Sequence, residues 1–335
     1  GVKECIELIK NENIDLVIGT GGYVTAPLIK AAQILKIPNF IHESNALPGK
    51  TTKILSPKTT CTMLGFNDAA KRIVSKNIRI TGNPNKMWQN TYTKNEAKEK
   101  ININGKLLLI TGGSQGAKGI NDAIINIITN NLFKEYNVIY ATGPKNYEEV
   151  TKLVLEKASN YYEIEKKEDE IILYSLESSL SIGNKNDKNI DFNTISVCNK
   201  IIIKKFIYDM EVVMKAADLM VSRSGALTCT EIIECGTPSI MIPFPYAAEN
   251  HQYYNAKTLE DAKAGIIIEE KNLNYKDLSK KINELILDDK KINEMSENAK
   301  KLIKGNASKK IKEIIYEYMK VENNKLRRNL KSKMR

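Results

Sequence analysis

The most constraining feature of this 335-residue sequence is a pattern that occurs three times: a short apolar run, a glycine-rich turn and a helical segment. The three copies cover residues 16–23, 107–116 and 219–228. Apolar strands that alternate with amphipathic helices are typical of parallel sheets covered by helices on both faces. The sequence therefore predicts an α/β protein with parallel sheets.

The third copy carries the strongest indication of a binding site. It reads Leu219-Met220-Val221-Ser222-Arg223-Ser224-Gly225-Ala226-Leu227-Thr228 and is followed by Glu231. The first backbone N–H groups of a helix have no partner within the helix and form an anion site, which suits a nucleoside diphosphate. Glu231 lies one turn into the same helix, where its carboxylate could hold ribose hydroxyls. Three such turns in one chain point to an enzyme that uses a nucleotide-sugar.

Chain length predicts two domains, because 335 residues with 42% hydrophobic content can bury two ordinary cores. We expect a first domain over 1–83, a linker over 84–104 and a second domain over 105–305. Within the second domain, residues 158–200 break the alternation of strands and helices and are interpreted as a surface insertion that is partly disordered. Residues 306–335 are expected to form a closing helix and a basic tail.

Composition narrows the class of protein. The five cysteines are an odd number without the spacing of metal ligands, which favours a reduced, cytoplasmic setting with the thiols as small apolar fillers. The longest apolar runs are too short to span a bilayer, and charges among the first ten residues argue against a signal peptide.

The formal charge of +11 is concentrated near the end of the chain. Between Val321 and Arg335 six basic residues stand against Glu322 alone. A helical tail would place Leu326 and Leu330 on one face among cations, a pattern that can bind anionic lipid; the alternative is a frayed, solvated tail. No aromatic residue interleaves with these cations, so nucleic acid is not an expected partner.

Three other places carry candidate ligand contacts. The Ser114 hydroxyl lies within the second glycine turn. Asn45 ends the run His42-Glu43-Ser44-Asn45 after a buried strand, at the edge where open α/β sheets bind ligands. His42 itself, as a lone histidine at a strand end, is more often structural than catalytic. Gln252 begins a helix rich in neutral donors and acceptors, the groups that read sugars.

No metal is expected at this site. The sequence holds no His/Cys cluster, and no Asp-x-Asp pair precedes an apolar strand. Cations and the helix dipole would then assist the departure of the diphosphate.

Taken together, these motifs resemble the MurG family of bacterial cell-wall N-acetylglucosaminyltransferases. The resemblance runs from Gly1 to about Met319, and the motifs that carry it are Gly19-Thr20-Gly21-Gly22-Tyr23, His42-Glu43-Ser44-Asn45, Gly82-Asn83-Pro84, Gly112-Gly113-Ser114-Gln115-Gly116, Arg223 to Thr228 with Glu231, and Gln252-Tyr253-Tyr254-Asn255. It implies the GT-B fold, in which two Rossmann-like domains surround a cleft, the first one on the acceptor and membrane side. It implies no cofactor and no metal.

The activity implied by this resemblance is inverting transfer of N-acetylglucosamine from UDP-N-acetylglucosamine to undecaprenyl-linked muramyl-pentapeptide. This step converts lipid I to lipid II in peptidoglycan synthesis, and so serves cell wall biogenesis, cell shape and cell division. The implied location is peripheral, at the cytoplasmic face of the cell membrane, on an anionic surface.

The resemblance also implies residue roles. Ile207 would hold uracil through its backbone. The diphosphate and ribose residues, with the remaining substrate-binding positions of the same helix, would be Ala226, Leu227, Thr228, Cys229, Thr230 and Glu231. Gln252 would read the sugar, with Asn45 and Ser114 lining the cleft. Lys86 stands where the family usually has an arginine after Gly-Asn-Pro. It would supply positive charge without the planar guanidinium group that can form two parallel hydrogen bonds.

One departure concerns the start of the chain. Family members begin with a further strand and a glycine-rich turn ending in histidine, thought to include the general base, and roughly 60 to 80 residues of this doubly wound pattern would precede Gly1. On this expectation the first domain is truncated, the catalytic base is unknown and His42 is a weak candidate. Such a chain would bind UDP but transfer the sugar slowly.

Two alternatives stay open at this point. A UDP-N-acetylglucosamine 2-epimerase has the same GT-B architecture, although the Gly22-Tyr23 turn and the loop from His42 to Asn45 favour the transferase. The other alternative is a non-catalytic UDP-sugar-binding protein.

Overall fold

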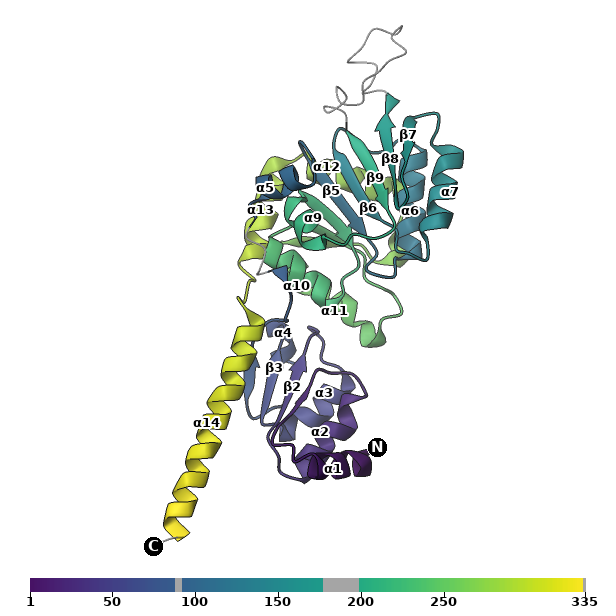
Figure 1. Ribbon diagram of the computed structural model, residues 1–335. Coiled ribbons are helices and arrows are strands. Elements are labelled where there is room, and N and C mark those ends of the chain that lie inside the picture. The colour runs from purple at the N-terminus through teal and green to yellow at the C-terminus, as the bar shows by residue number, and fades with distance from the viewer. Residues whose placement is uncertain (88–91, 177–198, 334–335) are drawn as a thin grey trace. The chain divides into compact units, whose positions relative to one another are not determined.

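The chain folds into two compact units (Figure 1). The computed structural model describes residues 1–87, 92–176 and 199–333, with side chains up to residue 320. The first unit consists of Gly1–Trp88 together with Lys304–Arg335, and the second of Gln89–Ile303. The segment after residue 305, which the sequence suggested as a separate region, therefore belongs to the first unit.

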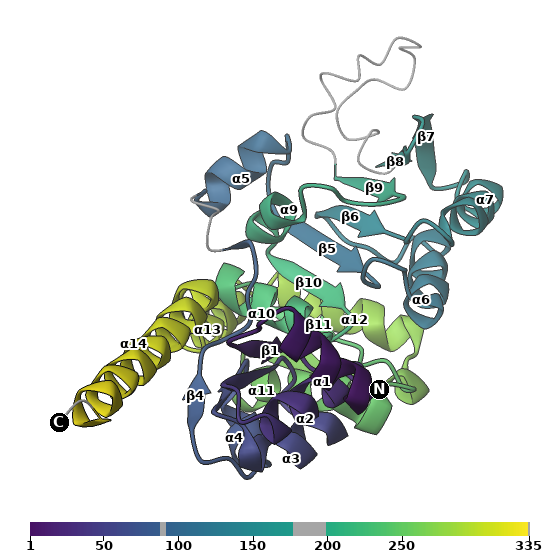
Figure 2. The same ribbon diagram turned by 60° about the horizontal axis from the view of Figure 1, so that its bottom comes forward.

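The first unit is a parallel four-stranded sheet in the order β1-β2-β3-β4 with helices around it (Figures 1 and 2). Its elements are α1 (Val2–Asn11), β1 (Val17–Gly19), α2 (Thr25–Ile34), β2 (Asn39–Glu43), α3 (Lys50–Leu55), η1 (Ser56–Lys58), β3 (Cys61–Leu64), α4 (Asn67–Ala70), β4 (Ile78–Ile80) and α14 (Ala307–Lys333). The register aligns Ile41 of β2 with Gly19 of β1 and with Thr62 of β3.

Both faces of this small sheet are covered, by parts of the chain far apart in sequence. Successive side chains of a strand point to opposite faces. Ile41 accordingly packs with residues of α1 and α2, whereas Phe40 packs with Ile314 and Tyr318 of α14. The rings of Phe40 and Tyr318 meet edge to face, with centroids 5.6 Å apart. The apolar face of α14 thus completes the core of the first unit.

The second unit is an eight-stranded sheet in the order β12-β11-β10-β5-β6-β9-β8-β7. Its elements are α5 (Lys94–Lys100), β5 (Leu107–Thr111), α6 (Lys118–Thr129), β6 (Asn137–Ala141), α7 (Tyr147–Lys157), β7 (Tyr162–Lys166), β8 (Glu170–Ser175), β9 (Lys200–Lys204), α9 (Met210–Ala216), β10 (Leu219–Ser222), α10 (Ala226–Cys235), β11 (Ser239–Met241), η4 (Ala248–Asn250), α11 (His251–Asp261), β12 (Gly265–Ile267), η5 (Glu270–Asn272), α12 (Tyr275–Ile286) and α13 (Asp289–Lys300). The strands from β12 to β9 run parallel, and β8 and β7 run antiparallel at the edge.

The core of the second unit explains why its strands read as continuous apolar runs. Every residue of β5 and β6 is buried, because helices cover both faces of a parallel sheet. On one face the isoleucines of α6, among them Ile120 and Ile124, pack with Ile282 of α12. Burial of one such side chain is worth about 1.5 to 3 kcal/mol. The predicted α/β architecture is confirmed, and the carboxyl ends of β5, β6, β9 and β10 meet at one edge.

The interpretation of residues 158–200 as an irregular insertion is wrong for the part that the structure describes. The strands Tyr162–Lys166 and Glu170–Ser175 form an antiparallel hairpin that extends the sheet beyond β9. Polar residues in these two strands obscured the strand pattern in the sequence, but Ile171 and Leu173 are buried in the main core. Residues 177–198 lie outside the described part of the chain.

The interpretation of residues 84–104 as a plain linker also needs correction, because α5 lies within it. Thr93 and Glu96 form a capping box at the start of this helix. Lys94 and Lys98 donate to the two oxygens of Asp218 at 2.8 and 2.7 Å. Burial opposes ionisation of Asp218, but these two cations outweigh it and lower its pKa. The segment is anchored to the second unit.

Candidate functional site

The turn between β10 and α10 presents free backbone donors. The first hydrogen bond of α10 runs from the Cys229 N–H to the Gly225 carbonyl at 2.9 Å. The N–H groups of Ala226, Leu227 and Thr228 therefore have no partner within the helix. Together with the positive end of the helix dipole, they have the features expected of an anion site, and binding of a diphosphate there stays a prediction. At the other end, α10 is closed by Gly236 in the left-handed conformation, with φ of 67°.

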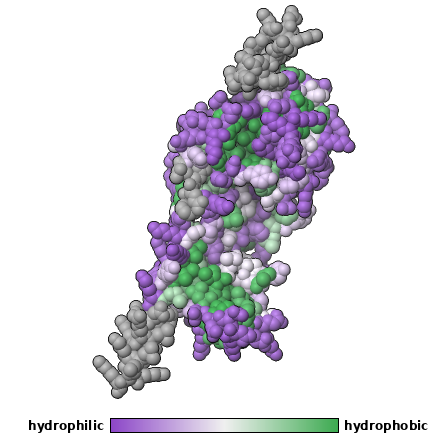
Figure 3. Space-filling view, in the orientation of Figure 1, coloured by the Kyte–Doolittle hydropathy of each residue, from purple (hydrophilic) through white to green (hydrophobic). Residues whose placement is uncertain are grey.

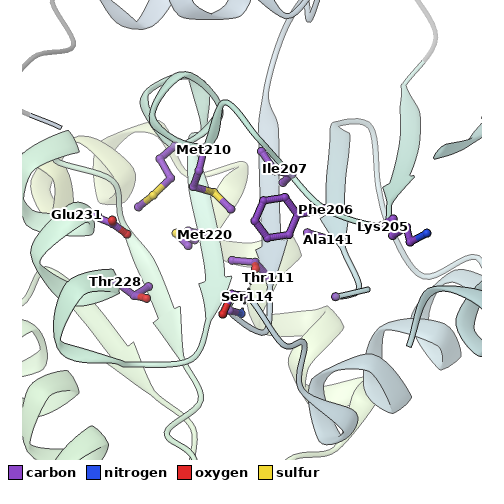
Figure 4. A pocket seen from close by; sticks show the side chains of 13 residues that line it. Thr111, Ser114, Ala141, Lys205, Phe206, Ile207, Met210, Met220, Thr228 and Glu231 are labelled. Carbon is purple, nitrogen blue, oxygen red and sulfur yellow. Dashed lines mark hydrogen bonds between the residues drawn. The ribbon is translucent and has the colours of Figure 1, made fainter. Parts of the chain in front are cut away.

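A cavity of about 180 Å³ opens beside this turn, at the carboxyl edge of the sheet (Figure 4). Its lining residues come from the ends of four parallel strands and from α9 and α10: Thr111, Gly113, Ser114, Ala141, Gly143, Lys205, Phe206, Ile207, Met210, Met214, Met220, Thr228 and Glu231. The structure thus brings together Ser114, Ile207, Thr228 and Glu231, which are far apart in sequence. The three methionines and Phe206 were missed by the sequence analysis.

Two of the missed residues, Phe206 and Met210, share a recognisable position with the predicted Ile207. Phe206 and Ile207 directly follow β9, and Met210 begins the next helix, so all three lie where ligands bind in open α/β sheets. Ile207 is buried, whereas 39% of the Phe206 surface is exposed and its ring meets Tyr208 edge to face at 5.2 Å. An aromatic ring in a mainly apolar cavity suits a flat base.

Glu231 is the principal titratable group in the cavity. Burial raises its pKa to about 7, and the negative charge of Glu211 adds to the shift. Methionine side chains line the cavity around it, and no ion pair to Glu231 occurs in the described part of the chain. A carboxylate held in an apolar place without a cation is poised to accept hydrogen bonds from hydroxyl groups.

Two glycine turns beside the cavity approach each other too closely for side chains. Gly116 and Gly143 have φ of 77° and 84°, and a Cβ on Gly116 would lie 2.1 Å from the Thr142 carbonyl oxygen. The turn after β5 and the turn after β6 are therefore locked together backbone to backbone. This packing holds Ser114 at the cavity, with its side chain exposed to solvent.

Gln252 lies in a hydrogen-bonded network next to the anion site. Its side-chain oxygen accepts from the Phe244 N–H at 2.9 Å, and its carbonyl accepts from the Ser224 hydroxyl at 2.9 Å. Asn255, on the same helix, donates to the Ser224 carbonyl at 3.2 Å. The loop that carries Phe244 is fixed in turn by Arg223, which donates to two of its carbonyls and pairs with Glu270. Gln252 is thus held beside the turn between β10 and α10.

Cys229 and Thr230 differ from the other predicted substrate-binding residues. The Cys229 thiol is fully buried, and burial raises its pKa far above the ordinary value. The Thr230 hydroxyl donates to the Ala226 carbonyl at 2.9 Å. With the Cys229 N–H also used within the helix, neither residue presents a side chain to the cavity. Helical periodicity turns these two positions toward the core, so of the predicted run only Thr228 and Glu231 line the cavity, and the role of the run in substrate binding stays a prediction.

In the first unit, the residues of two family motifs bond to each other. His42 is buried and its Nε2 lies 3.0 Å from the Gly82 carbonyl. Burial lowers its pKa, although the hydrogen bond to Gly82 and the charge of Glu43 oppose the shift. Asn83 donates to the Ser44 carbonyl at 3.0 Å. His42 therefore links β2 to the turn after β4, which is the structural role that the sequence favoured for it.

Glu43 organises the loop that carries Asn45. Its buried carboxylate accepts from the Asn45 and Gly49 N–H groups at 3.0 and 3.1 Å and from the Thr52 hydroxyl at 2.5 Å. The Asn45 side chain also donates to it at 3.3 Å. Lys86 is exposed in the same unit. Asn45 and Lys86 thus lie on the first unit, and the cavity residues on the second.

The described residues contain no group of three or more His, Cys, Asp or Glu side chains arranged to hold a metal ion. Within the same residues, no helix has the length and apolar character needed to cross a membrane.

Comparison with known proteins identifies related sequences. The model of the glycosyltransferase family 28 N-terminal domain matches residues 1–64, and that of the family 28 C-terminal domain matches residues 107–184 and 163–315. The UDP-N-acetylglucosamine–N-acetylmuramyl-(pentapeptide) pyrophosphoryl-undecaprenol N-acetylglucosamine transferase of Acetivibrio thermocellus is 36% identical over 96% of this chain and 77% of the relative. The enzyme of the same name from Caldanaerobacter subterraneus is 35% identical over 94% of this chain and 77% of the relative.

Solved structures show the same relationship. The crystal structure of Acinetobacter baumannii MurG is similar with a TM-score of 0.70 and 26% identity, over 94% of this chain and 78% of that one. The UDP-N-acetylglucosamine 2-epimerase of Neisseria meningitidis is similar with a TM-score of 0.58 and 15% identity, over 94% and 80% of the two chains, which shows a shared fold alone. The GT-B expectation is confirmed, and the chain belongs to the family 28 glycosyltransferases of the MurG type, the UDP-N-acetylglucosamine–N-acetylmuramyl-(pentapeptide) pyrophosphoryl-undecaprenol N-acetylglucosamine transferases.

Proposed function

We propose that this chain transfers N-acetylglucosamine from UDP-N-acetylglucosamine to undecaprenyl-linked muramyl-pentapeptide, the step from lipid I to lipid II in peptidoglycan synthesis. The observation that carries this proposal is membership of the family, with relatives at 33% to 36% identity that carry this activity in their names. The cavity on the second unit supports it, because it combines an anion site, a carboxylate and an apolar wall of the kind that a uridine nucleotide needs.

Each part of the donor has a matching group in this cavity. The free N–H groups of Ala226 to Thr228 would bind the diphosphate, and the Glu231 carboxylate would accept from the ribose hydroxyls. The backbone of Ile207 would pair with uracil, and the Phe206 ring offers it an apolar face. Ser114, on the opposite side of the cavity, would donate its hydroxyl to a phosphate oxygen.

The sugar would be read beside the phosphate turn. Gln252 uses its side-chain oxygen to accept from Phe244, and in the described part of the chain its amide NH₂ group has no partner. This group can donate to a hydroxyl of N-acetylglucosamine. Asn45 and Lys86, on the first unit, would serve the acceptor, where the Lys86 ammonium would attract the lipid-linked pyrophosphate.

An inverting transfer needs a base within reach of the acceptor hydroxyl. His42 is unsuited to this role, because its Nε2 is occupied by the Gly82 carbonyl and the ring is buried. The proton acceptor therefore stays unassigned among the described residues. The positive end of α10 would stabilise the departing diphosphate without a metal ion.

The membrane-bound acceptor requires contact with a membrane surface, which we propose to be peripheral and on the cytoplasmic face. The backbone of α14 is helical to Lys333, so the basic segment from Lys325 continues one helix. The first unit also exposes apolar side chains such as Tyr23 and Val24, and a broad hydrophobic area is visible on it in Figure 3. Deletion of 325–335 should reduce co-sedimentation with anionic vesicles, and added salt should reduce it as well.

A transfer assay tests the proposed function. Labelled UDP-N-acetylglucosamine and lipid-linked muramyl-pentapeptide should yield a labelled disaccharide lipid, with EDTA making little difference. Loss of transfer in Glu231→Ala with retention in Glu234→Ala, one turn further along α10 and outside the cavity, would support the assignment. Formation of UDP-N-acetylmannosamine from the donor in the absence of acceptor would instead indicate an epimerase. Binding of the donor with neither reaction would indicate a non-catalytic protein.

A further inference from the structure

The antiparallel hairpin of β7 and β8 lies next to the strand that leads into the donor cavity. β9 pairs with β6 on one side and with β8 on the other. After Lys204 the chain leaves the sheet and forms the cavity wall at Lys205, Phe206 and Ile207. Without β8, β9 would be an edge strand with a row of unpaired backbone groups, and its end would open easily. The hairpin therefore controls how firmly this wall is held.

Contacts from the turn between β7 and β8 hold the end of β9 at Lys204, the last residue before the cavity wall. The Lys205 N–H donates to the Asp169 carbonyl at 3.2 Å, and the Lys204 ammonium pairs with Glu170. From the opposite side, the Thr142 N–H donates to the Lys204 carbonyl at 3.1 Å. Lys204 is thus fixed by both neighbouring strands. A second cation contact, between Lys205 and Asp169, is long at 3.8 Å.

The pair of Glu170 and Lys204 is the stronger of the two ion pairs. Its side chains are 21% and 33% exposed, whereas those of Asp169 and Lys205 are 65% and 42% exposed and more fully screened by water. Lys167 lies 3.4 Å from the Glu170 carboxylate on its other side. Burial opposes ionisation of Glu170, but the hydrogen bonds and charges of Lys204 and Lys167 outweigh it and lower its pKa.

We propose that Glu170 is a positioning residue for nucleotide selection, which acts through Lys204 to fix the backbone of Phe206 and Ile207 against the base. The proposal rests on the proposed function, in which this backbone pairs with uracil. Backbone donors and acceptors distinguish one base from another only when they are held in place. The proposed diphosphate site follows β10, and β5, β6 and β9 lie between β10 and the hairpin in the sheet. Loosening the hairpin should therefore weaken base discrimination more than phosphate binding.

The test is calorimetric binding of UDP and CDP to the full chain and to Glu170→Gln. The two bases differ at the edge that a backbone would read, while the ribose and diphosphate are the same. We expect UDP binding to weaken about fivefold, and CDP binding to change less, so that the preference for UDP falls. The matched control is Glu163→Gln on β7, an acid of the same hairpin that has no ion pair in the described part of the chain; its preference should equal that of the wild type.

A charge swap distinguishes positioning from a general loss of stability. Glu170→Lys combined with Lys204→Glu restores an ion pair of reversed polarity and should recover most of the preference for UDP, which either single change should lower. An unchanged preference in Glu170→Gln would overturn the proposal, even if its melting temperature fell. A wild-type chain that bound UDP no better than CDP would instead overturn the proposed uridine site itself, and the positioning role with it.

Discussion

The two units use their motif residues in opposite ways. In the second unit, Glu231, Ser114 and Thr228 line a cavity, and the first N–H groups of α10 have no partner within the helix. In the first unit, His42 and Glu43 are buried, and their polar atoms form hydrogen bonds with neighbouring backbone and loop residues. Both sets of residues stand in motifs of the same family. A motif residue can thus line a cavity itself, or it can hold in place the loop that carries another motif residue.

Substitutions in the two units should therefore have different consequences. Removal of a carboxylate that holds a loop should lower stability and leave donor binding unchanged. Removal of a carboxylate that faces a cavity should do the reverse, because burial of Glu231 without a cation costs stability rather than adding to it. The predictions below test this separation.

The largest effect is expected for Glu43→Ala. Its carboxylate accepts hydrogen bonds from Asn45, Gly49 and Thr52, and their loss in a buried place should lower stability by about 3 kcal/mol. Thermal unfolding and hydrogen exchange of residues 43–52 measure this change, with Glu12→Ala, an exposed acid of the same unit, as the control. UDP affinity should be retained. Weaker UDP binding without a change in melting temperature would contradict the separation.

Next in size is Glu231→Ala. Loss of charge-assisted hydrogen bonds to the ribose should weaken UDP binding by about 1.5 to 3 kcal/mol, roughly tenfold to a hundredfold. Stability should be equal or slightly higher, since a poorly solvated carboxylate is removed. Calorimetry with UDP and a melting curve without ligand give the two numbers. An affinity within twofold of the wild type would remove Glu231 from the ribose site.

The effect of pH on donor binding should be smaller than the effect of Glu231→Ala, and it tests whether the Glu231 carboxyl titrates in the site. The pKa of Glu231 is raised to about 7 in the empty protein, so below neutral pH the carboxyl is protonated and cannot accept from both hydroxyls. Donor affinity should therefore rise as pH increases from 6 to 8. Stability of the empty protein should move the opposite way, because a carboxyl with a raised folded-state pKa loses its favourable contribution as pH rises from about 4.5 to about 7.

UDP-N-acetylglucosamine is the suitable probe for this experiment, because its diphosphate is esterified at both ends and does not titrate in that range. Glu231→Gln should bind it with little dependence on pH. A persistent slope in that variant would assign the titration to another group.

The smallest effect on affinity is expected for Gln252→Ala. It should reduce the preference for UDP-N-acetylglucosamine over UDP-N-acetylgalactosamine and leave UDP affinity within about twofold, the loss of one neutral hydrogen bond. Gln252→Glu is a second variant, since it keeps an acceptor for the Phe244 N–H while it removes the NH₂ donor and adds a negative charge. Equal losses for UDP and for the sugar nucleotide would show that Gln252 merely supports the loop.

Much of the second unit could be predicted from its sequence. The turn at 219–228 has a strand, a glycine and a helix start in adjacent positions, and local rules suffice to place free N–H groups there. The hairpin of β7 and β8 could not be predicted in this way. In β7 the acids Glu163 and Glu165 alternate with Tyr162 and Ile164, and β8 has only a short apolar run from Ile171 to Leu173. The pairing of β8 with β9, about 30 residues further along the chain, places them in the sheet. The helix at 94–100 was missed because its anchor, Asp218, is also distant in sequence.

The sequence by itself determined the class of fold, the family and the position of the glycine turn before α10, because glycine turns and buried strands are encoded by neighbouring residues. Only the tertiary structure decided which polar residues line the cavity. Cys229 and Glu231 lie two positions apart on α10, yet one is fully buried and the other borders the cavity. The separation arises because a helix turns by about 100° per residue and the sheet covers one side of it. The same holds for His42, whose role follows from a carbonyl forty residues away that no local pattern could place beside it.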